Sequence, residues 1–451
     1  MVKSRLLLVG WLIGSLVGVA AHADADILVR WDRDQMPSRE SLGVSTIVVP
    51  AANRTAVRNA IAEGYGVFVE VDAAALASAS LPARGLSGVI VKGTPSAAAL
   101  TALRTRLDAR GLPVRVLEER GKWPHIRSNM VTSNNGVLQV GSRTQQPWIE
   151  NNAALMRIAR LAKPDTMPLL TYTWQPNTVA DADEGPALDE YLVAIAEAGS
   201  FGADLVLPLH QRLQNDLLLG TPPARADWKA MRDAIAFANW DLPTRYQPTA
   251  NIGVLAADPM RWFEVMNLLA RHNLSFVPLG ASLGTRDLGA FDLLIVLDAL
   301  GGRDIDTAAA FARKGGTVVF VGVKGLTGDA GKGRVIEHKP VENPDTFALE
   351  MRQLLGRDRR VIQIWNGITV LAQHFTSPDK KTVLLTLVNY SHQELPVQLR
   401  VPGTFSAVHY ESPEDAPVLL PYQHRDGFTE FVVPALHVGA RVFLTGESDA
   451  K

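Results

Sequence analysis

The chain has 451 residues, of which 47% are hydrophobic and 20% charged, and its formal net charge is −1. A chain of this length is expected to form two or three domains. The balanced charge argues against a nucleic-acid partner, because no excess of Lys and Arg is present to replace phosphate counterions. The absence of cysteine excludes disulfides, thiolate metal sites and cysteine nucleophiles.

The first 23 residues have the pattern of a cleavable secretory signal peptide. Lys3 and Arg5 precede an apolar run over 6–21, and the sequence AHA at 21–23 is a small-x-small pattern that a signal peptidase accepts. The run is slightly short for a membrane span, and no second span follows. We therefore expect a periplasmic or extracellular protein with no membrane attachment after cleavage. An uncleaved N-terminal anchor is the alternative.

Residues 24–242 alternate short apolar segments with amphipathic helical patterns. Eight segments are short, β-branched and apolar on both faces, which is typical of parallel strands covered by helices. Between most of them leucines recur at helical spacing, as at Leu100, Leu103 and Leu107, although 120–135 shows no helical stripe. The pattern predicts a (β/α)8 TIM-like barrel, with an open doubly wound sheet as the alternative. The expected strands are 27–31, 46–50, 66–71, 88–93, 114–119, 136–141, 168–174 and 203–210.

Two further units follow the expected barrel. The segment 243–249, PTRYQPT, has the composition of a linker. Residues 250–356 again alternate strands with helices, which predicts a small flavodoxin-like α/β layer. Over 357–447 the apolar period changes to two and no helical pattern separates the strands, so we expect an antiparallel β-sandwich.

Acidic residues stand at the ends of the expected barrel strands, where catalytic groups of barrel enzymes lie. Glu70 ends the third strand, and Glu118 and Glu119 end the fifth. Glycoside hydrolysis needs two carboxyl groups on opposite sides of the scissile bond. Because Glu118 and Glu119 are adjacent, they point to opposite faces of a strand and at most one faces the barrel mouth. The expected catalytic pair is one of them with Glu70 or Asp32 across the barrel.

Cationic, imidazole and indole side chains share the same strand ends. Indole faces stack on pyranose rings and fork-like donors bind hydroxyl groups, so this composition favours a sugar site. Structural ion pairs that close the barrel rim are the alternative. His125 and His210 lack the spacing of a zinc motif, and we expect no metal and no cofactor. The expected substrate-binding residues are Asp32, Lys92, Arg120, Trp123, His125, Arg143, Trp174 and His210.

In the order of these three units the chain resembles beta-galactosidases that join a TIM barrel, a glutamine-amidotransferase-like domain and a small C-terminal β-domain. The resemblance implies an oligosaccharide or polysaccharide substrate and an amidotransferase-like fold over 250–356, and it allows a homo-oligomer assembled through that domain. That family has Asn-Glu at the end of strand four and Glu at the end of strand seven. Here those strands end at Lys92-Gly93 and Trp174-Gln175. Neither catalytic position carries over, and without cysteine the middle domain cannot be a working amidotransferase.

Three hypotheses follow for the function. The first is an exported, glycoside hydrolase-like protein that uses two carboxylates at the barrel mouth. The second is a carbohydrate-binding protein of the same architecture without hydrolytic activity, which the missing family carboxylates favour. The third is an envelope scaffold, which would present an exposed apolar patch instead of a deep pocket.

Overall fold

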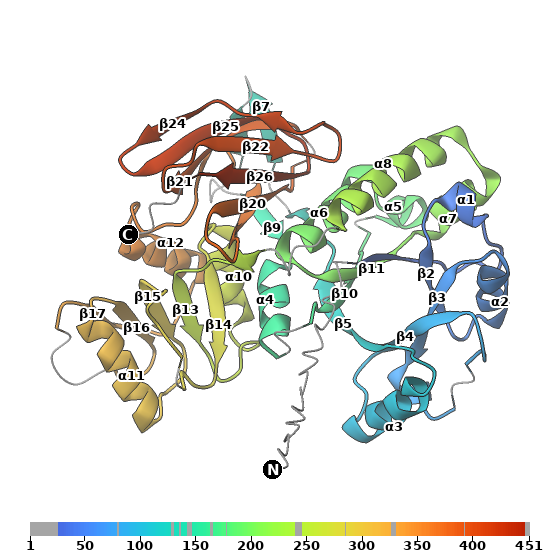
Figure 1. The fold of residues 1–451 in the computed structure, drawn as a ribbon, viewed down its shortest axis with the longest axis horizontal. Helices are drawn as coiled ribbons and strands as arrows, with labels where there is room; N and C mark the ends of the chain where they lie inside the picture. Colours follow the sequence, from blue (N-terminus) through green and yellow to red (C-terminus); the bar gives the residue numbers. More distant parts are fainter. Residues whose placement is uncertain are drawn as a thin grey trace, which may run out of the picture.

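The computed structural model has three parts, which Figure 1 shows as a barrel with the middle α/β unit and the C-terminal sheets beside it. The expected signal peptide, 1–23, and the candidate residue Arg143 lie outside the described residues. No helix in the described part of the chain is both long and apolar enough to cross a membrane. The structure describes residues 26–78, 81–127, 130–134, 137–141, 147–162, 166–176, 178–239, 246–284, 286–325, 331–391 and 393–446.

The first part is a closed barrel of parallel strands, as the sequence predicted. Around the barrel the strands follow the order β1-β11-β10-β5-β4-β3-β2, so seven described strands close it where eight were expected. Most of the strands are short and largely apolar, because both of their faces are covered, whereas β5 is longer and charged towards its end. The strands are β1 (Ile27–Arg30), β2 (Thr46–Pro50), β3 (Gly66–Asp72), β4 (Leu86–Lys92), β5 (Val114–Lys122), β10 (Leu169–Thr173) and β11 (Asp204–Pro208).

The segment expected as the sixth strand lies outside the barrel sheet. It forms β8 (Val137–Gly141), which pairs antiparallel with β7 (Met130–Asn134) in a separate hairpin. A second small antiparallel sheet joins β6 (His125–Arg127) to β9 (Trp148–Glu150). A parallel neighbour needs a crossover of a dozen or more residues, and the stretch before 136 has no helical stripe to supply one. The expectation of a sixth barrel strand here was therefore wrong.

Helices cover most of the barrel, and their ends follow local sequence signals. The side chain of Asn53 accepts a hydrogen bond from the Ala56 amide at the start of α2, and Ser96 does the same for α3. Gly202 ends α6 in the left-handed conformation, with a φ of 72°. The helices are α1 (Arg39–Leu42), α2 (Arg54–Ala62), α3 (Ala97–Asp108), α4 (Ala153–Ala162), α5 (Val179–Glu184), α6 (Leu188–Phe201), α7 (Gln211–Leu219) and α8 (Pro222–Ala238).

The middle part is a five-stranded parallel sheet in the order β14-β13-β15-β16-β17. Numbered within the unit this order is 2-1-3-4-5, which is the flavodoxin-like order that was expected. Helix α4 of the barrel packs against it, and the Arg157 guanidinium lies 4.5 Å from the ring centre of Phe276. Its elements are β13 (Ile252–Leu255), α10 (Phe263–Arg271), β14 (Phe276–Gly280), β15 (Leu293–Val296), α11 (Gly302–Arg313), β16 (Thr317–Val321), β17 (Arg334–His338) and α12 (Pro344–Leu355).

The C-terminal part consists of two antiparallel sheets that share one apolar core. The six-stranded sheet has the order β12-β19-β20-β26-β22-β23 and the four-stranded sheet has the order β18-β21-β25-β24, which together form the expected sandwich. The six-stranded sheet packs on α6 of the barrel. Its strands are β12 (Gln247–Pro248), β18 (Gln363–Trp365), β19 (Val370–Thr376), β20 (Thr382–Asn389), β21 (Leu395–Pro402), β22 (Ala407–Glu411), β23 (Val418–Leu419), β24 (Tyr422–Arg425), β25 (Phe428–Leu436) and β26 (Gly439–Thr445).

Candidate active site at the barrel mouth

A layer of charged side chains lies at the carboxyl end of the barrel interior. Below it each barrel strand contributes one apolar side chain to an inner cluster: Leu28, Val48, Phe68, Ile90, Leu117, Leu169 and Val206. Residues two positions further along a strand point to the same side. The next layer towards the mouth therefore contains four ionisable residues, which we name the mouth ring: Arg30, Glu70, Lys92 and Glu119.

Glu70 and Arg30 form one ion pair of the mouth ring. The Arg30 Nη2 atom lies 3.2 Å from Glu70 Oε1, and the Glu70 side chain is only 6% exposed. Burial raises the pKa of Glu70, and the positive charges of Arg30 and Lys92 only partly oppose that effect. Asp32, just after β1, lies on the other side of Arg30, with 3.4 Å between its Oδ1 atom and Arg30 Nε. Glu70 is therefore a carboxyl group that protonates more readily than an exposed glutamate.

Glu119 and Lys92 form the second pair of the mouth ring, 3.9 Å apart, and each side chain is 37% exposed. Glu119 stands in a β-bulge of β5. Glu118 pairs with Leu170 and Gly121 pairs with Tyr172, so two residues of β5 lie opposite one residue of β10. Bulges re-aim side chains and are frequent beside active sites. Glu119 is thus more open to solvent than Glu70 and carries a cation beside it.

Glu118 lies on the opposite face of β5 from Glu119. The guanidinium of Arg120 binds it with two hydrogen bonds, of 2.7 and 2.5 Å, and the Arg120 amide donates a third of 3.0 Å. Burial raises the pKa of Glu118, but the hydrogen bonds from Arg120 outweigh it and leave that pKa lowered. Both residues belong to a local ion pair outside the mouth ring.

Aromatic groups stand on the part of the rim formed by β10 and β11. Trp174 follows β10, is half-buried and meets the His210 ring edge-on, with 6.0 Å between ring centres. The His210 ring caps α7 by accepting from the Arg212 amide, and its Nε2 atom lies 3.1 Å from the Ala182 carbonyl oxygen. Charged side chains thus lie at the ends of β1, β3, β4 and β5. Aromatic side chains follow β10 and β11, the two strands between β5 and β1 in the barrel.

Trp123 differs from the exposed tryptophan that the sequence predicted. It is 3% exposed and packs edge-on against Tyr191 of α6, with 5.4 Å between ring centres. His125 lies beyond it on β6, with its Nδ1 atom 2.8 Å from the Trp123 carbonyl oxygen. Neither ring face of Trp123 is free for a sugar, so the expectation of stacking at this position was wrong. Its burial comes from Tyr191, which is distant in sequence.

A second polar cluster, around one buried carboxylate, lies where the barrel meets the sandwich. It was not predicted from the sequence. Glu197 of α6 is fully buried and accepts hydrogen bonds from the backbone amide of Asn152 (2.8 Å), the Asn152 side chain (2.7 Å) and the Tyr390 hydroxyl (2.7 Å). Tyr172 of β10 lies beside it, and its pKa is raised by burial and then by the Glu197 charge. We name Asn152, Tyr172, Glu197 and Tyr390 the junction cluster. A single glutamate within the apolar sequence of α6 was the available signal.

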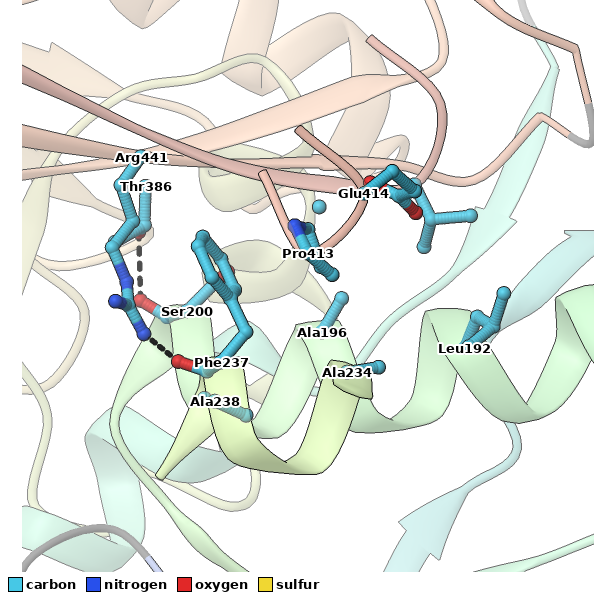
Figure 2. Close-up of a pocket in the computed structure, with 13 residues that line it drawn as sticks. Leu192, Ala196, Ser200, Ala234, Phe237, Ala238, Thr386, Pro413, Glu414 and Arg441 are labelled. Carbon is cyan, nitrogen blue, oxygen red and sulfur yellow. Dashed lines mark hydrogen bonds between the residues drawn. The ribbon is translucent and has the colours of Figure 1, made fainter. Parts of the chain in front are cut away.

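An apolar hollow among the described residues lies away from the mouth ring. It encloses about 420 Å³ between α6, α8 and the sandwich, and Figure 2 shows it bordered by small side chains such as Ala196 and Ala238. Its polar neighbours already have partners. Arg441 lies 3.2 Å from Glu411, and Thr386 donates a hydrogen bond of 2.8 Å to the Ser200 carbonyl oxygen. We therefore interpret the hollow as part of the packing seam.

The described residues contain no group of three His, Asp or Glu side chains that could hold a metal ion.

Solved structures with a similar fold include glycoside hydrolases. An alpha-L-fucosidase isoenzyme 2 from Paenibacillus thiaminolyticus is 11% identical with a TM-score of 0.60, covering 94% of this chain and 100% of that one. A GH42 beta-galactosidase from G. stearothermophilus is 10% identical with a TM-score of 0.47, covering 94% and 100% of the two chains. A rhamnosidase from Novosphingobium sp. PP1Y is 13% identical with a TM-score of 0.46, covering 88% of this chain and 38% of that one.

These likenesses concern the fold. The likeness in fold rests on the fucosidase comparison. It extends over almost all of the chain and agrees with the order of barrel, α/β unit and β-domain that the sequence suggested. No protein-family model matches the chain, and no curated protein is similar to it in sequence. The chain therefore has a glycoside hydrolase-like fold, and its chemistry has to be inferred from its own residues.

Proposed function

We propose that the protein hydrolyses glycosidic bonds of an oligosaccharide or polysaccharide at the barrel mouth, with Glu70 as general acid and Glu119 as its partner carboxylate. The observation that carries the proposal is the mouth ring itself: two carboxylates in one interior layer of a glycoside hydrolase-like barrel, each beside a different cation. The sequence from 1 to 23 supports export of the protein to the periplasm or beyond.

The two carboxylates have environments suited to different roles. A general acid has to hold its proton near neutral pH, and burial of Glu70 acts in that direction. Glu119 is more exposed and has the Lys92 ammonium beside it, which stabilises a negative charge. One buried and one more exposed carboxyl group are an arrangement from which acid and base can be assigned in glycosidases.

The strand positions are compatible with the inverting arrangement. Glu70 is on β3 and Glu119 on β5, with β4 between them. Neighbouring strands are about 4.8 Å apart, so the two backbones are separated by roughly 10 Å. Inverting glycosidases separate their carboxyl groups by about 6.5 to 9.5 Å to admit a water, whereas retaining enzymes need about 5 to 5.5 Å. In this proposal Glu119 is the base that activates the water.

Other groups at the mouth are suited to binding the sugar. Asp32 lies beside Arg30 at the charged side of the mouth, and its carboxylate is suited to accept hydrogen bonds from hydroxyl groups. Trp174 and His210 supply ring edges and faces on the other side. We infer a structural role for the middle α/β unit, because a chain without cysteine has no amidotransferase nucleophile.

A carbohydrate-binding protein without hydrolytic activity is the second candidate. The observation in its favour is that β4 ends at Lys92 and that Trp174-Gln175 follow β10, where the resembled beta-galactosidases carry their glutamates. Under this alternative the mouth ring is a set of structural ion pairs and only the binding groups act.

Hydrolysis and binding can be separated with one set of proteins. Wild type, Glu70→Gln and Glu119→Gln are incubated with a panel of aryl glycosides and glycans, and glycan binding is measured by calorimetry. The proposal predicts hydrolysis by wild type and retained binding with lost turnover in both variants. Binding without hydrolysis by wild type would support the second candidate, and neither activity would overturn both.

A further inference from the structure

The junction cluster is connected to the end of β5 by an unbroken series of hydrogen bonds. The series begins in the sandwich, where the Tyr390 hydroxyl donates to Glu197 Oε1 at 2.7 Å. The same oxygen accepts from the Asn152 amide at 2.8 Å, and Glu197 Oε2 accepts from Asn152 Nδ2 at 2.7 Å. Tyr390, Glu197 and Asn152 are each at most 2% exposed. One carboxylate therefore joins the sandwich, helix α6 and the loop before α4.

The side chain of Asn152 also binds the backbone of β5. Its Oδ1 atom accepts a hydrogen bond of 2.8 Å from the Lys122 amide, and its Nδ2 atom donates one of 2.8 Å to the Lys122 carbonyl oxygen. This pair mimics the bonds that a neighbouring strand would make to the backbone. Lys122 is the last residue of β5 and lies just after the bulge that contains Glu119. Beyond the bulge β5 still pairs with β10, whereas its pairing with β4 ends at Val116, so the Asn152 contacts are a second hold on the end of β5.

From this geometry we infer that Glu197 and Tyr390 are positioning residues, which hold the end of β5 and with it the Glu119 carboxylate at the barrel mouth. The inference rests on the proposed function for what Glu119 does, but the connection itself is independent of that chemistry. It gives the C-terminal sandwich a role in the site although no sandwich residue belongs to the mouth ring.

The polarity of the series explains why a carboxylate is needed at 197. Glu197 faces donors only: the Asn152 amide, the Asn152 side-chain NH₂ and the Tyr390 hydroxyl bind it, and the Tyr172 hydroxyl lies beside it. In Glu197→Gln, one oxygen becomes an NH₂ group that opposes Asn152 Nδ2. Asn152 cannot rotate its amide to correct this, because both of its ends are fixed by Lys122. A buried donor without an acceptor is costly, so the series should break at this point.

Tyr390→Phe tests the inference with the smallest change, because it removes one hydroxyl of a fully buried residue. Tyr410→Phe is the matched control. Tyr410 is a buried tyrosine of the same sandwich whose hydroxyl donates 2.9 Å to the Ala435 carbonyl oxygen, and it has no link to Glu197. Amide hydrogen exchange is followed for the peptide 118–124 and for the reference peptide 66–72 of β3. Urea unfolding of each protein corrects for global stability.

We expect Tyr390→Phe to accelerate exchange in 118–124 by about 10-fold or more beyond its effect on 66–72, and Tyr410→Phe to leave that ratio unchanged. Unchanged exchange at 118–124 in Tyr390→Phe would overturn the inference, whatever the activity. On a hydrolysed glycoside, Tyr390→Phe should lower kcat by about 10-fold with KM unchanged, since misplacement of a reacting group lowers turnover. Accelerated exchange in a protein that hydrolyses nothing would support the connection and overturn the proposed function instead.

Discussion

Glu70 and Glu197 are both buried glutamates whose pKa burial raises, yet they belong to different kinds of site. Glu70 lies inside the barrel mouth, next to one cation and within the field of another. Glu197 has no ion pair among the described residues and is held by three hydrogen bonds from Asn152 and Tyr390. The first carboxyl group lies among charged side chains at the end of the barrel, whereas the second is enclosed by neutral hydrogen-bond donors.

The comparison shows that a perturbed pKa does not by itself identify a catalytic group. Burial acts on Glu70 and Glu197 in the same direction. What separates them is their neighbours: Glu70 lies among charged side chains and two strands from a second carboxylate, Glu119, while the neighbours of Glu197 are neutral donors from three separate segments. Mutations at the two positions should therefore change different properties.

The largest expected effect is on catalysis at the mouth. Glu70→Gln keeps the size of the side chain but cannot donate a proton, so kcat/KM should fall by about 10²- to 10⁴-fold with little change in stability. Steady-state kinetics on the best substrate of the panel measures this. Glu430→Gln, which removes an ion-paired carboxylate of the sandwich, is the control and should retain full activity. Activity above about one third of wild type in Glu70→Gln would remove it as the acid.

The second largest effect is expected on the free energy of unfolding, through Glu197 at the contact between the barrel and the sandwich. Glu197→Ala leaves the buried donors of Asn152 and Tyr390 without an acceptor and should lower the free energy of unfolding by about 3 to 5 kcal/mol. Urea denaturation measures the loss. Glu118→Ala breaks a more exposed pair with Arg120 and should cost at most about 1 kcal/mol. Equal losses in the two variants would contradict the contrast between seam and rim.

A smaller effect concerns the pH dependence of activity. Arg30 lowers the pKa of Glu70 against the dominant effect of burial, so Arg30→Met should raise that pKa further. If Glu70 is the acid, loss of its proton sets the alkaline limb of kcat/KM, and this limb should move up by about one pH unit. Arg400→Met, which breaks an ion pair in the sandwich, should leave it in place. A limb that stays or moves down in Arg30→Met would contradict the assignment.

The smallest effect is expected at His437, a titratable group of the seam. A hydrogen bond that His437 donates to the Glu414 carboxylate raises the pKa of His437, with further contributions from Asp189 and Glu394. A raised pKa stabilises the fold fully below the unfolded value of about 6.5, and this contribution is lost as the pH rises through the folded value. The side chain is 34% exposed, so the contribution should stay below about 1 kcal/mol.

Unfolding of wild type and His437→Gln at pH 5.5 and 8.5 isolates this contribution. The difference in unfolding free energy between the two proteins should be larger at pH 5.5. A larger difference at pH 8.5 would show that the sign is wrong.

Much of the mouth could be predicted because it depends on local rules. Carboxyl ends of parallel strands meet at one end of a barrel, and side chains alternate along a strand. These rules place Glu70, Lys92 and Glu119 together and Glu118 on the other face, as the structure has them.

The errors come from contacts between distant segments. Trp123 is buried by Tyr191 of α6, and no local pattern around Trp123 indicates that helix. The apolar alternation at 137–141 is equally typical of a hairpin and of a barrel strand. A barrel strand needs a crossover helix before it, and because the sequence before 136 has no helical pattern, this segment forms a hairpin instead. Glu197 stands out only when Asn152 and Tyr390 are brought to it by folding. The alternation of apolar residues predicts the strands and helices. Which polar side chains become buried depends on residues from other segments that pack against them.

The central claim is tested most directly by two adjacent residues of one strand. Glu119→Gln and Glu118→Gln make the same chemical change at neighbouring positions that face the mouth and the outer surface of β5. Their kcat/KM values on one glycoside are compared with that of wild type. We predict a loss of about 10²-fold or more for Glu119→Gln and less than about 3-fold for Glu118→Gln. An equal loss in both, or a larger loss for Glu118→Gln, would contradict a catalytic role for the mouth ring.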